Sequence, residues 1–211
     1  MRSPATWRAT PSAGYNGPRI VLVHGLAAGR HMERHLLAWL RELGYEDVTL
    51  YSNYLPTVVL ARDVRSAVEA GRATALIGYS QGGFQVVKAA RRLARQDIAV
   101  DLLVTLAAGG AGRFYFPQLG ADPRHIPPNV RRCLNYYAEG DWLGTDVISR
   151  ANLAVADARD THVENIAYPR DARVDHVGIV RCYPPELVPP AVRVLFLERL
   201  QRELESLRPS P

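Results

Sequence analysis

The sequence predicts an α/β protein, organised as a three-layer α/β/α sandwich around a mostly parallel sheet of six strands. Strand-like and helix-like stretches alternate along the chain without internal repeats, a pattern that favours parallel strands joined by crossover helices. The strand-like stretches are apolar almost throughout, as in residues 19–23 (RIVLV) and 73–77 (ATALI). Strands of this kind are buried on both faces, so helices are expected on both sides of the sheet.

Each expected element is bounded by turn residues or by a change of hydrophobic period. The first expected strand, residues 19–23, is followed by a helix with apolar residues at helical spacing from Met32 to Leu43, which Gly44 ends. The other expected strands are residues 47–51, 73–79, 101–107, 130–138 and 162–168. The other expected helices are residues 58–68, 84–95 and 141–160, with a final amphipathic helix that buries Val192, Phe196, Leu200 and Leu204.

Length and composition predict one globular domain. At 211 residues, 47% hydrophobic and 22% charged, the chain is long enough for a full core. We expect an N-terminal extension at residues 1–18, a single domain at 19–207 and a frayed tail at 208–211. No stretch has the length of a signal peptide's apolar core or of a membrane span, so we expect a cytoplasmic or otherwise soluble protein without stable membrane insertion.

The basic charge does not predict a polyanion partner. The net charge is +5, but Lys88 is the only lysine among the 26 basic residues, and the arginines are scattered without a basic run interleaved with aromatics. This pattern favours a solvated arginine-rich surface over a nucleic-acid site. The sequence leaves the oligomeric state open.

The two cysteines, Cys133 and Cys182, form neither a disulfide framework nor a CxxC or Cys/His metal motif. We therefore expect no metal. Buried hydrophobic thiols are the favoured interpretation of both residues, and a single bridge between them is the alternative.

The most informative motif is Gly78-Tyr79-Ser80-Gln81-Gly82, which lies between an apolar strand and a helix-like stretch. A serine at a sharp strand-to-helix turn is a nucleophile elbow. The turn strains the serine backbone, and glycines on either side remove the Cβ atoms that would collide there. Ser80 is therefore the predicted nucleophile.

His176 is the predicted general base, because it follows the last expected strand and precedes the final helix. A neutral imidazole near physiological pH can take the serine proton and return it to the leaving group. The other histidines fit this position less well, and a structural or exposed role is favoured for each. They are His24, His31, His35, His125 and His162.

Asp141 is the predicted acid of the triad, because it lies where the strand at 130–138 ends. A buried carboxylate there would hold the histidine tautomer and stabilise the imidazolium. Asp146 is the main rival and Glu139 a weaker one. Asp175, adjacent to His176, cannot easily reach the distal ring nitrogen.

The oxyanion hole needs two backbone N–H donors. One is expected from Gln81, the residue after the nucleophile, at the positive end of its helix. The other is expected from Leu26, in the glycine-flanked loop His24-Gly25-Leu26-Ala27-Ala28-Gly29 after the first predicted strand. His24 is expected to brace this loop.

Together these residues resemble the α/β-hydrolase superfamily, in particular its small serine esterases and lipases. The resemblance covers about residues 19–204 and is carried by His24-Gly25, Gly78 to Gly82, Asp141 and His176. It implies a Ser-His-Asp enzyme that acts on an acyl bond without a metal or organic cofactor. The chain is short for this family, with no evident room for the first two antiparallel strands or a large helical cap. The resemblance therefore implies a minimal fold with little or no cap.

The favoured function is a serine hydrolase that cleaves a small-molecule or lipid carboxylic ester through an acyl-enzyme. An acyl thioesterase or acyltransferase with the same triad is the alternative. A non-catalytic binding protein with the same fold is the third hypothesis. The irregular stretch 108–128 forms either a partial cap or a loop packed on the domain. Candidates for the acyl site are Tyr79, Phe114, Tyr115, Phe116 and Trp142, although aromatic residues are more often core or surface packing residues.

Overall fold

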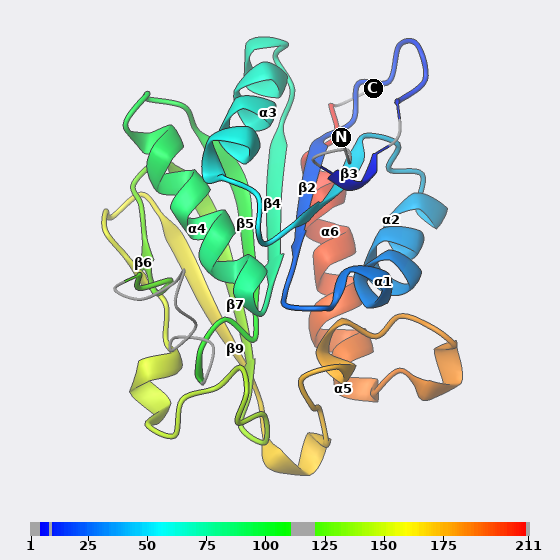
Figure 1. The fold of residues 1–211 in the computed structure, drawn as a ribbon, viewed down its shortest axis with the longest axis vertical. Coiled ribbons are helices and arrows are strands. Elements are labelled where there is room, and N and C mark those ends of the chain that lie inside the picture. Colours follow the sequence, from blue (N-terminus) through cyan, green and yellow to red (C-terminus); the bar gives the residue numbers. More distant parts are fainter. Residues whose placement is uncertain (1–4, 9, 111–120, 210–211) are drawn as a thin grey trace.

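A seven-stranded sheet forms the middle layer of the computed structural model, which describes residues 5–8, 10–110 and 121–209 (Figure 1). The spatial order of the strands is β1-β3-β2-β4-β5-β7-β9. The strands are β1 (Ala5–Arg8), β2 (Arg19–His24), β3 (Val48–Ser52), β4 (Thr74–Tyr79), β5 (Val100–Leu106), β7 (Val130–Ala138) and β9 (His162–Tyr168). The predicted mostly parallel sheet is confirmed.

The main sheet has one strand more than the six that the sequence predicts. β1 pairs antiparallel with β3, with Trp7 opposite Leu50 and a bulge between Ala5 and Trp7. It lies within the stretch expected to be an N-terminal extension. The strand has only four residues and no apolar run, so it carries no signal that marks a buried strand.

Helices cover both faces of the sheet. One face carries the first and last helical segments, each interrupted by a π-helical turn, and the other carries α3 and α4 (Figure 1). The first segment comprises α1 (Gly29–Met32), a π-turn (Glu33–Leu37) and α2 (Ala38–Glu42), and the last comprises α5 (Pro190–Val192), a π-turn (Arg193–Leu197) and α6 (Glu198–Ser206). The helices of the other face are α3 (Thr57–Glu69) and α4 (Gln81–Ala94).

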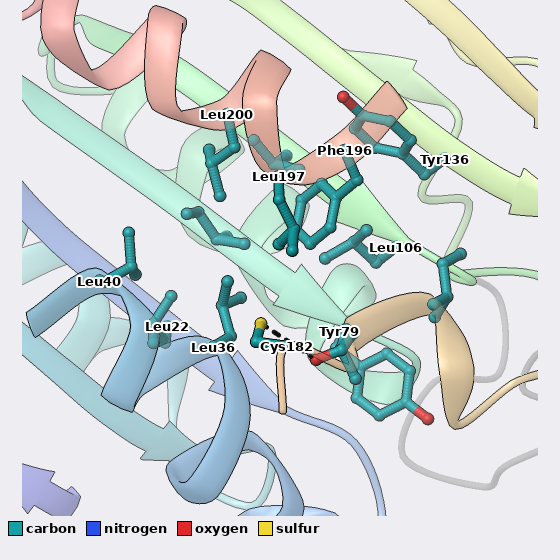
Figure 2. Packing of buried hydrophobic residues seen from close by; sticks show 14 of the residues in the cluster. Leu22, Leu36, Leu40, Tyr79, Leu106, Tyr136, Cys182, Phe196, Leu197 and Leu200 are labelled. Atoms are coloured by element: carbon teal, nitrogen blue, oxygen red, sulfur yellow. Dashed lines mark hydrogen bonds between the residues drawn. The ribbon is translucent and has the colours of Figure 1, made fainter. Parts of the chain in front are cut away.

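Each face has its own hydrophobic core, because fully apolar strands present side chains to both sides. Figure 2 shows the first face, where Leu36 and Leu40 pack beside Leu22 while Phe196 and Leu200 of the last helical segment lie nearby. The opposite core is built by side chains of α3 and α4 against the strands. The β2, β4 and β5 strands are therefore held from both sides, which fixes the ends from which the site residues emerge.

The predicted helix at residues 141–160 is wrong. This stretch contains only a 3-10 turn, Ser149–Asn152, and the short strand β8 (Val155–Ala156), which pairs with β6 (His125–Ile126). Side-chain amides replace helical bonds here: Asn152 Oδ1 accepts from the Asp146 amide at 2.6 Å, and Asn152 Nδ2 donates to the Asp146 carbonyl at 2.9 Å. Such side chains compete with the helix for backbone partners.

Both cysteines are free and buried, and they lie in the two separate cores. The alternative of a bridge between them is therefore wrong. Burial raises the pKa of the Cys133 thiol to about 12, so this side chain packs as a hydrophobe. Among the described residues, no helix combines the length and the apolar character needed to cross a bilayer.

Candidate active site

Ser80 lies at a sharp turn between β4 and α4. Its backbone is strained, with φ 53° and ψ −121°, a region that side-chain-bearing residues rarely adopt. Its amide donates to the carbonyl of Leu106 at 2.8 Å, which ties the turn to β5. The flanking glycines are sterically required, because a Cβ on Gly78 would meet the backbone of Gly82, and one on Gly82 would meet the carbonyl of Val23. The turn has the geometry of a nucleophile elbow.

His176 lies in the loop after β9, with one ring nitrogen toward Ser80 and the other toward Asp141. Nε2 is 3.0 Å from Ser80 Oγ, and Nδ1 is 2.7 Å from Asp141 Oδ2. Because a carboxylate only accepts, Nδ1 carries the proton and Nε2 faces the serine hydroxyl with its lone pair. The imidazole side chain is 17% exposed, so a solvent path to it remains. This arrangement can move a proton from Ser80 to His176.

Asp141 lies just past the turn that follows β7, and it is buried, with 2% of its side chain exposed. While Oδ2 contacts His176, Oδ1 accepts from the amides of Leu143 at 3.0 Å and Gly144 at 3.1 Å. These bonds orient the carboxylate and compensate for its burial. One carboxylate oxygen of Asp141 thus binds the imidazole, and the other stabilises the turn that contains Asp141.

The other candidate carboxylates, all of which the structure describes, do not contact His176 through a hydrogen bond. Asp146 Oδ2 accepts from the Gly110 amide at 3.3 Å, and Glu139 is exposed. Asp175 Oδ1 accepts from the Gly178 amide at 2.5 Å. Asp141 is the carboxylate that the structure brings to His176.

The loop after β2 packs directly against the elbow. A Cβ on Gly25 would lie 2.7 Å from Ser80 Cβ and 3.1 Å from Ser80 Oγ, so the absence of a side chain there lets the loop approach the serine. His24 is buried and donates from Nδ1 to the Gly25 carbonyl at 2.6 Å, and burial lowers its pKa. The loop that contains Leu26 and the first turn of α4, which begins at Gln81, thus both adjoin Ser80.

Comparison with known proteins supports this architecture at the level of the fold. No protein-family model matches the sequence, and no curated protein matches it. Several solved structures are similar. Aspergillus fumigatus lipase B has 15% identity and a TM-score of 0.62, with 92% of this chain and 57% of that chain covered. The RedJ thioesterase of the prodiginine pathway in Streptomyces coelicolor has 14% identity and a TM-score of 0.53, with 96% and 97% covered. Mouse α/β-hydrolase domain-containing protein 10 has 13% identity and a TM-score of 0.51, with 94% and 93% covered.

The chain has the α/β-hydrolase fold. In this α/β-hydrolase fold the strand ends that carry Ser80, Asp141 and His176 meet at one edge of the parallel sheet. The order of the three residues along the chain is the order that this fold uses for nucleophile, acid and base.

Apolar side chains are exposed around that edge of the hydrolase fold. They come from the loops after four different strands: Leu26 (41% exposed), Tyr54 (68%), Trp142 (74%) and Val177 (44%). Trp142 also lines a groove of about 480 Å³ together with Asp141 and Arg170. Phe114, Tyr115 and Phe116 lie outside the described residues, and so does the middle of the stretch 108–128.

Tyr79 does not face this exposed edge. Only 2% of it is exposed, and its hydroxyl donates to the backbone carbonyl of His176 at 2.7 Å. Its ring is tilted against the imidazole of His176, with 5.1 Å between ring centroids. Its observed contact is thus with the predicted base.

Sequence reasoning missed two groups of side chains that hold the site. Asn135, Asn152 and Asn165 connect the segment that follows Asp141 to the sheet. Asn135 Nδ2 donates to the Asn152 carbonyl at 2.7 Å and to Asn165 Oδ1 at 2.8 Å. Two histidines of the first helical segment contact the loop of the base. His31 lies 3.0 Å from the Val177 carbonyl, and His35 accepts from the amides of residues 182 and 183. The four-residue spacing of the histidines was the one available signal, since it places both on one helix face.

Proposed function

We propose that this protein is a serine hydrolase that cleaves carboxylic esters through an acyl-enzyme intermediate. The observation that carries the proposal is the hydrogen-bonded chain from Ser80 through His176 to the buried Asp141. A strained serine, a base within hydrogen-bond reach and a buried orienting carboxylate form the constellation of nucleophilic acyl transfer.

The first half-reaction forms an acyl-enzyme. Ser80 Oγ attacks the ester carbonyl while its proton passes to His176 Nε2, and Asp141 stabilises the resulting imidazolium. The carbonyl oxygen becomes an oxyanion between the amides of Leu26 and Gln81. When the tetrahedral intermediate collapses, the C–O bond to the alcohol breaks and His176 gives its proton to the departing oxygen.

The second half-reaction releases the acid. His176 Nε2 takes a proton from water, and the water oxygen attacks the acyl carbon. Collapse of this second intermediate breaks the bond to Ser80 Oγ, which recovers the proton from His176. Ester and water thus become acid and alcohol, and the enzyme returns to its starting state.

Apolar esters are the favoured substrate class. The side chains of Leu26, Trp142 and Val177 are exposed at the edge that carries Ser80, and exposed apolar groups at such an edge suit an acyl chain. The structural similarity to a lipase is consistent with this class.

Removal of the nucleophile tests the proposal. Ser80→Ala is expected to lower the hydrolysis of a short-chain nitrophenyl ester by a factor on the order of 10⁶ and to abolish labelling by a fluorophosphonate. The control is Ser66→Ala, at an exposed serine on α3, which should leave both unchanged. Circular dichroism confirms that both variants fold. Retained turnover in folded Ser80→Ala would exclude the serine mechanism.

A thioesterase or acyltransferase is the second candidate, because the same three residues can act on a thioester and the chain is also similar in structure to the RedJ thioesterase. A panel of matched esters and thioesters of graded acyl length separates the two classes by kcat/KM. Faster consumption of the thioesters at every length would replace the ester assignment. Product analysis with an added alcohol acceptor distinguishes transfer from hydrolysis.

A further inference from the structure

Two neighbouring carbonyls on the loop of the predicted base are held by side chains from other elements. The Tyr79 hydroxyl donates to the carbonyl of His176 at 2.7 Å. His31 Nε2 lies 3.0 Å from the carbonyl of Val177, and because a carbonyl only accepts, this nitrogen carries the proton and donates. The backbone on the C-terminal side of the base is thus fixed at two successive peptide groups.

We propose that Tyr79 and His31 are positioning residues that hold His176 in line with Ser80. The proposal rests on the serine-hydrolase function above and adds two residues that act on the base through its backbone. Neither side chain needs to touch the substrate for this role.

Hydrogen bonds within the loop that contains His176 determine the shape of the loop. They do not determine its position relative to the rest of the protein. Asp175 closes the turn, with its carbonyl accepting from the Ile179 amide at 3.1 Å and its carboxylate accepting from the Gly178 amide. These bonds connect residues within the loop, so they would move with it as a unit. The distance from His176 to Ser80 therefore depends on contacts to the rest of the protein.

Tyr79 is suited to set this distance because it precedes the nucleophile in the chain. A closed ring of bonds runs from Ser80 through the peptide bond to Tyr79, from its hydroxyl to the His176 carbonyl, and from the imidazole back to Ser80 Oγ. In Figure 2 the phenol of Tyr79 points away from the leucines of the core. Burial and the nearby charges of Asp141 and Asp175 raise the pKa of this phenol, so its hydroxyl stays a donor when the base is active.

His31 couples the base to the other side of the site. It belongs to α1, which begins at Gly29 where the loop of the predicted oxyanion donor Leu26 ends. Its bond to Val177 therefore joins the base loop to the helix behind that oxyanion loop. Through Tyr79 and His31, the base is tied to both elements that would contact the reacting carbonyl.

A competing account is that burial alone places the loop. Ile179 and Val180, just after the bonded carbonyls, are completely buried. If their packing were sufficient, the Tyr79 hydroxyl would be dispensable for catalysis. Removal of this hydroxyl decides between the accounts.

The experiment compares Tyr79→Phe with Tyr136→Phe. Tyr136 is a matched control, because it is buried in the same core and its hydroxyl donates to the carbonyl of Leu195 at 3.0 Å. Both tyrosines are labelled in Figure 2. Each variant loses one hydroxyl that donates to a backbone carbonyl, so loss of stability is matched while only Tyr79→Phe frees the base loop.

We expect Tyr79→Phe to lower kcat and the rate of fluorophosphonate labelling roughly 10- to 100-fold with KM changed less than about twofold, because small displacements of a catalytic group have costs of this size. Tyr136→Phe should retain wild-type kcat. In proton NMR, the low-field signal of the His176 Nδ1 proton should broaden in Tyr79→Phe and persist in Tyr136→Phe.

Equal kcat values in the two variants, or an unaltered low-field signal in Tyr79→Phe, would overturn the role of Tyr79. The NMR signal does not require turnover, so it tests positioning even if the wild-type protein cleaves no ester. A wild-type protein inert to fluorophosphonate would instead contradict the proposed function.

His31 is tested by a pair of substitutions. His31→Gln retains a side-chain N–H near the position of Nε2, whereas His31→Leu removes it. We expect His31→Leu to lower kcat several-fold and His31→Gln to restore most of the loss, with KM the same in both. Equal activity of the two variants would remove the hydrogen bond to Val177 from the proposal.

Discussion

The two sides of the candidate site are held in place by different kinds of contact. On the nucleophile side, backbone packs on backbone: Gly82 lies against the Val23 carbonyl, and the Ser80 amide donates to Leu106. On the acid and base side, side chains reach to the backbone. Asp141 binds its own turn, and Tyr79 and the histidines of the first helical segment bind the loop of His176.

Because of this difference, the two sides of the site should be sensitive to different kinds of change. The backbone contacts at the elbow involve no titratable group and leave no room for an extra atom, although the buried His24 lies in the loop packed against the elbow. The acid and base side depends on single side-chain hydrogen bonds, which substitution or protonation removes one at a time. The elbow should therefore respond to steric changes, and the acid and base side to changes of polar groups.

After the loss expected for Ser80→Ala, the next largest effect on catalysis is on the acid and base side. Asp141→Asn should lower kcat by about 10⁴, because the neutral amide no longer selects the tautomer with Nδ1 protonated or stabilises the imidazolium. Steady-state kinetics on a nitrophenyl ester measure this effect. Thermal unfolding should show that the variant folds, since the amide oxygen can still accept from the Leu143 and Gly144 amides.

Asp146→Asn is the matched comparison in the same segment. Its carboxylate accepts from the Gly110 amide at 3.3 Å, and an amide oxygen can replace it, so kcat should stay within a few-fold of wild type. If Asp146→Asn lost more activity than Asp141→Asn, the acid would have to be reassigned.

The next largest effect is steric and falls on the elbow. Gly82→Ala places a Cβ against the backbone of Val23 and His24, which cannot move aside as a flexible side chain could. We expect the free energy of unfolding to fall by about 3 kcal/mol or more, as for severe overpacking. Urea denaturation measures the change.

Gly140→Ala supplies the contrast from the acid side. Nothing lies within 4 Å of a Cβ at Gly140, so its free energy of unfolding should be unchanged or raised by up to about 1 kcal/mol. Similar stability losses in the two alanine variants would contradict the view that contact with the Val23 backbone is what makes Gly82 intolerant of a side chain.

The nucleophile side was predictable from sequence because its determinants are local. An apolar strand, a serine between glycines and a helical period follow one another from residue 73 to residue 94, and the structure has the strand, the turn and the helix there. The position of Asp141 was predictable for the same reason, since it follows a continuous strand. Local patterns of this kind fix where a strand ends.

The rest of the acid side depends on contacts between residues distant in the chain. Apolar residues in 141–160 suggested a helix, but the segment is bound instead to side chains of the sheet. Asn135 reaches the Asn152 carbonyl, and Asn165 Oδ1 accepts from the Ala154 amide at 2.7 Å. A hydrophobic period does not report such polar pairs, because their partners are identified only after the strands are aligned.

The same reason hides the role of Tyr79 and the two histidines. Tyr79 and His176 are 97 residues apart, and His35 and Tyr183 are 148 residues apart. A spacing of four residues is typical of one helix face, but it does not show what that face contacts. The contact between these histidines and the loop that contains His176 can be identified only from the three-dimensional structure.

The smallest expected effect is a pH dependence of the base side. His35 Nδ1 accepts from the amides of Cys182 at 3.3 Å and Tyr183 at 3.2 Å, so the ring must be neutral at Nδ1. Burial, followed by the nearby positive charges of His31, Arg181 and Arg34, lowers its pKa from 6.5 to about 4. A proton on Nδ1 would break both hydrogen bonds.

The sign of the pH effect follows from proton linkage. Because the folded-state pKa lies below that of the unfolded chain, the unfolded state binds the proton more readily between these two values. The stability that His35 contributes is therefore present above about pH 6.5 and declines as the pH falls toward about 4. Urea denaturation at a series of pH values across this window measures the slope.

His35→Asn isolates this contribution, because the amide oxygen of asparagine can accept near the position of Nδ1 and does not titrate in this range. Its free energy of unfolding should fall less steeply with acid than that of the wild type, while the two proteins differ little at neutral pH. Part of the slope should persist in the variant, since burial also lowers the pKa of His24 and His31. Identical slopes would show that His35 adds no measurable proton linkage, and the pH dependence of the base side would then rest on His31.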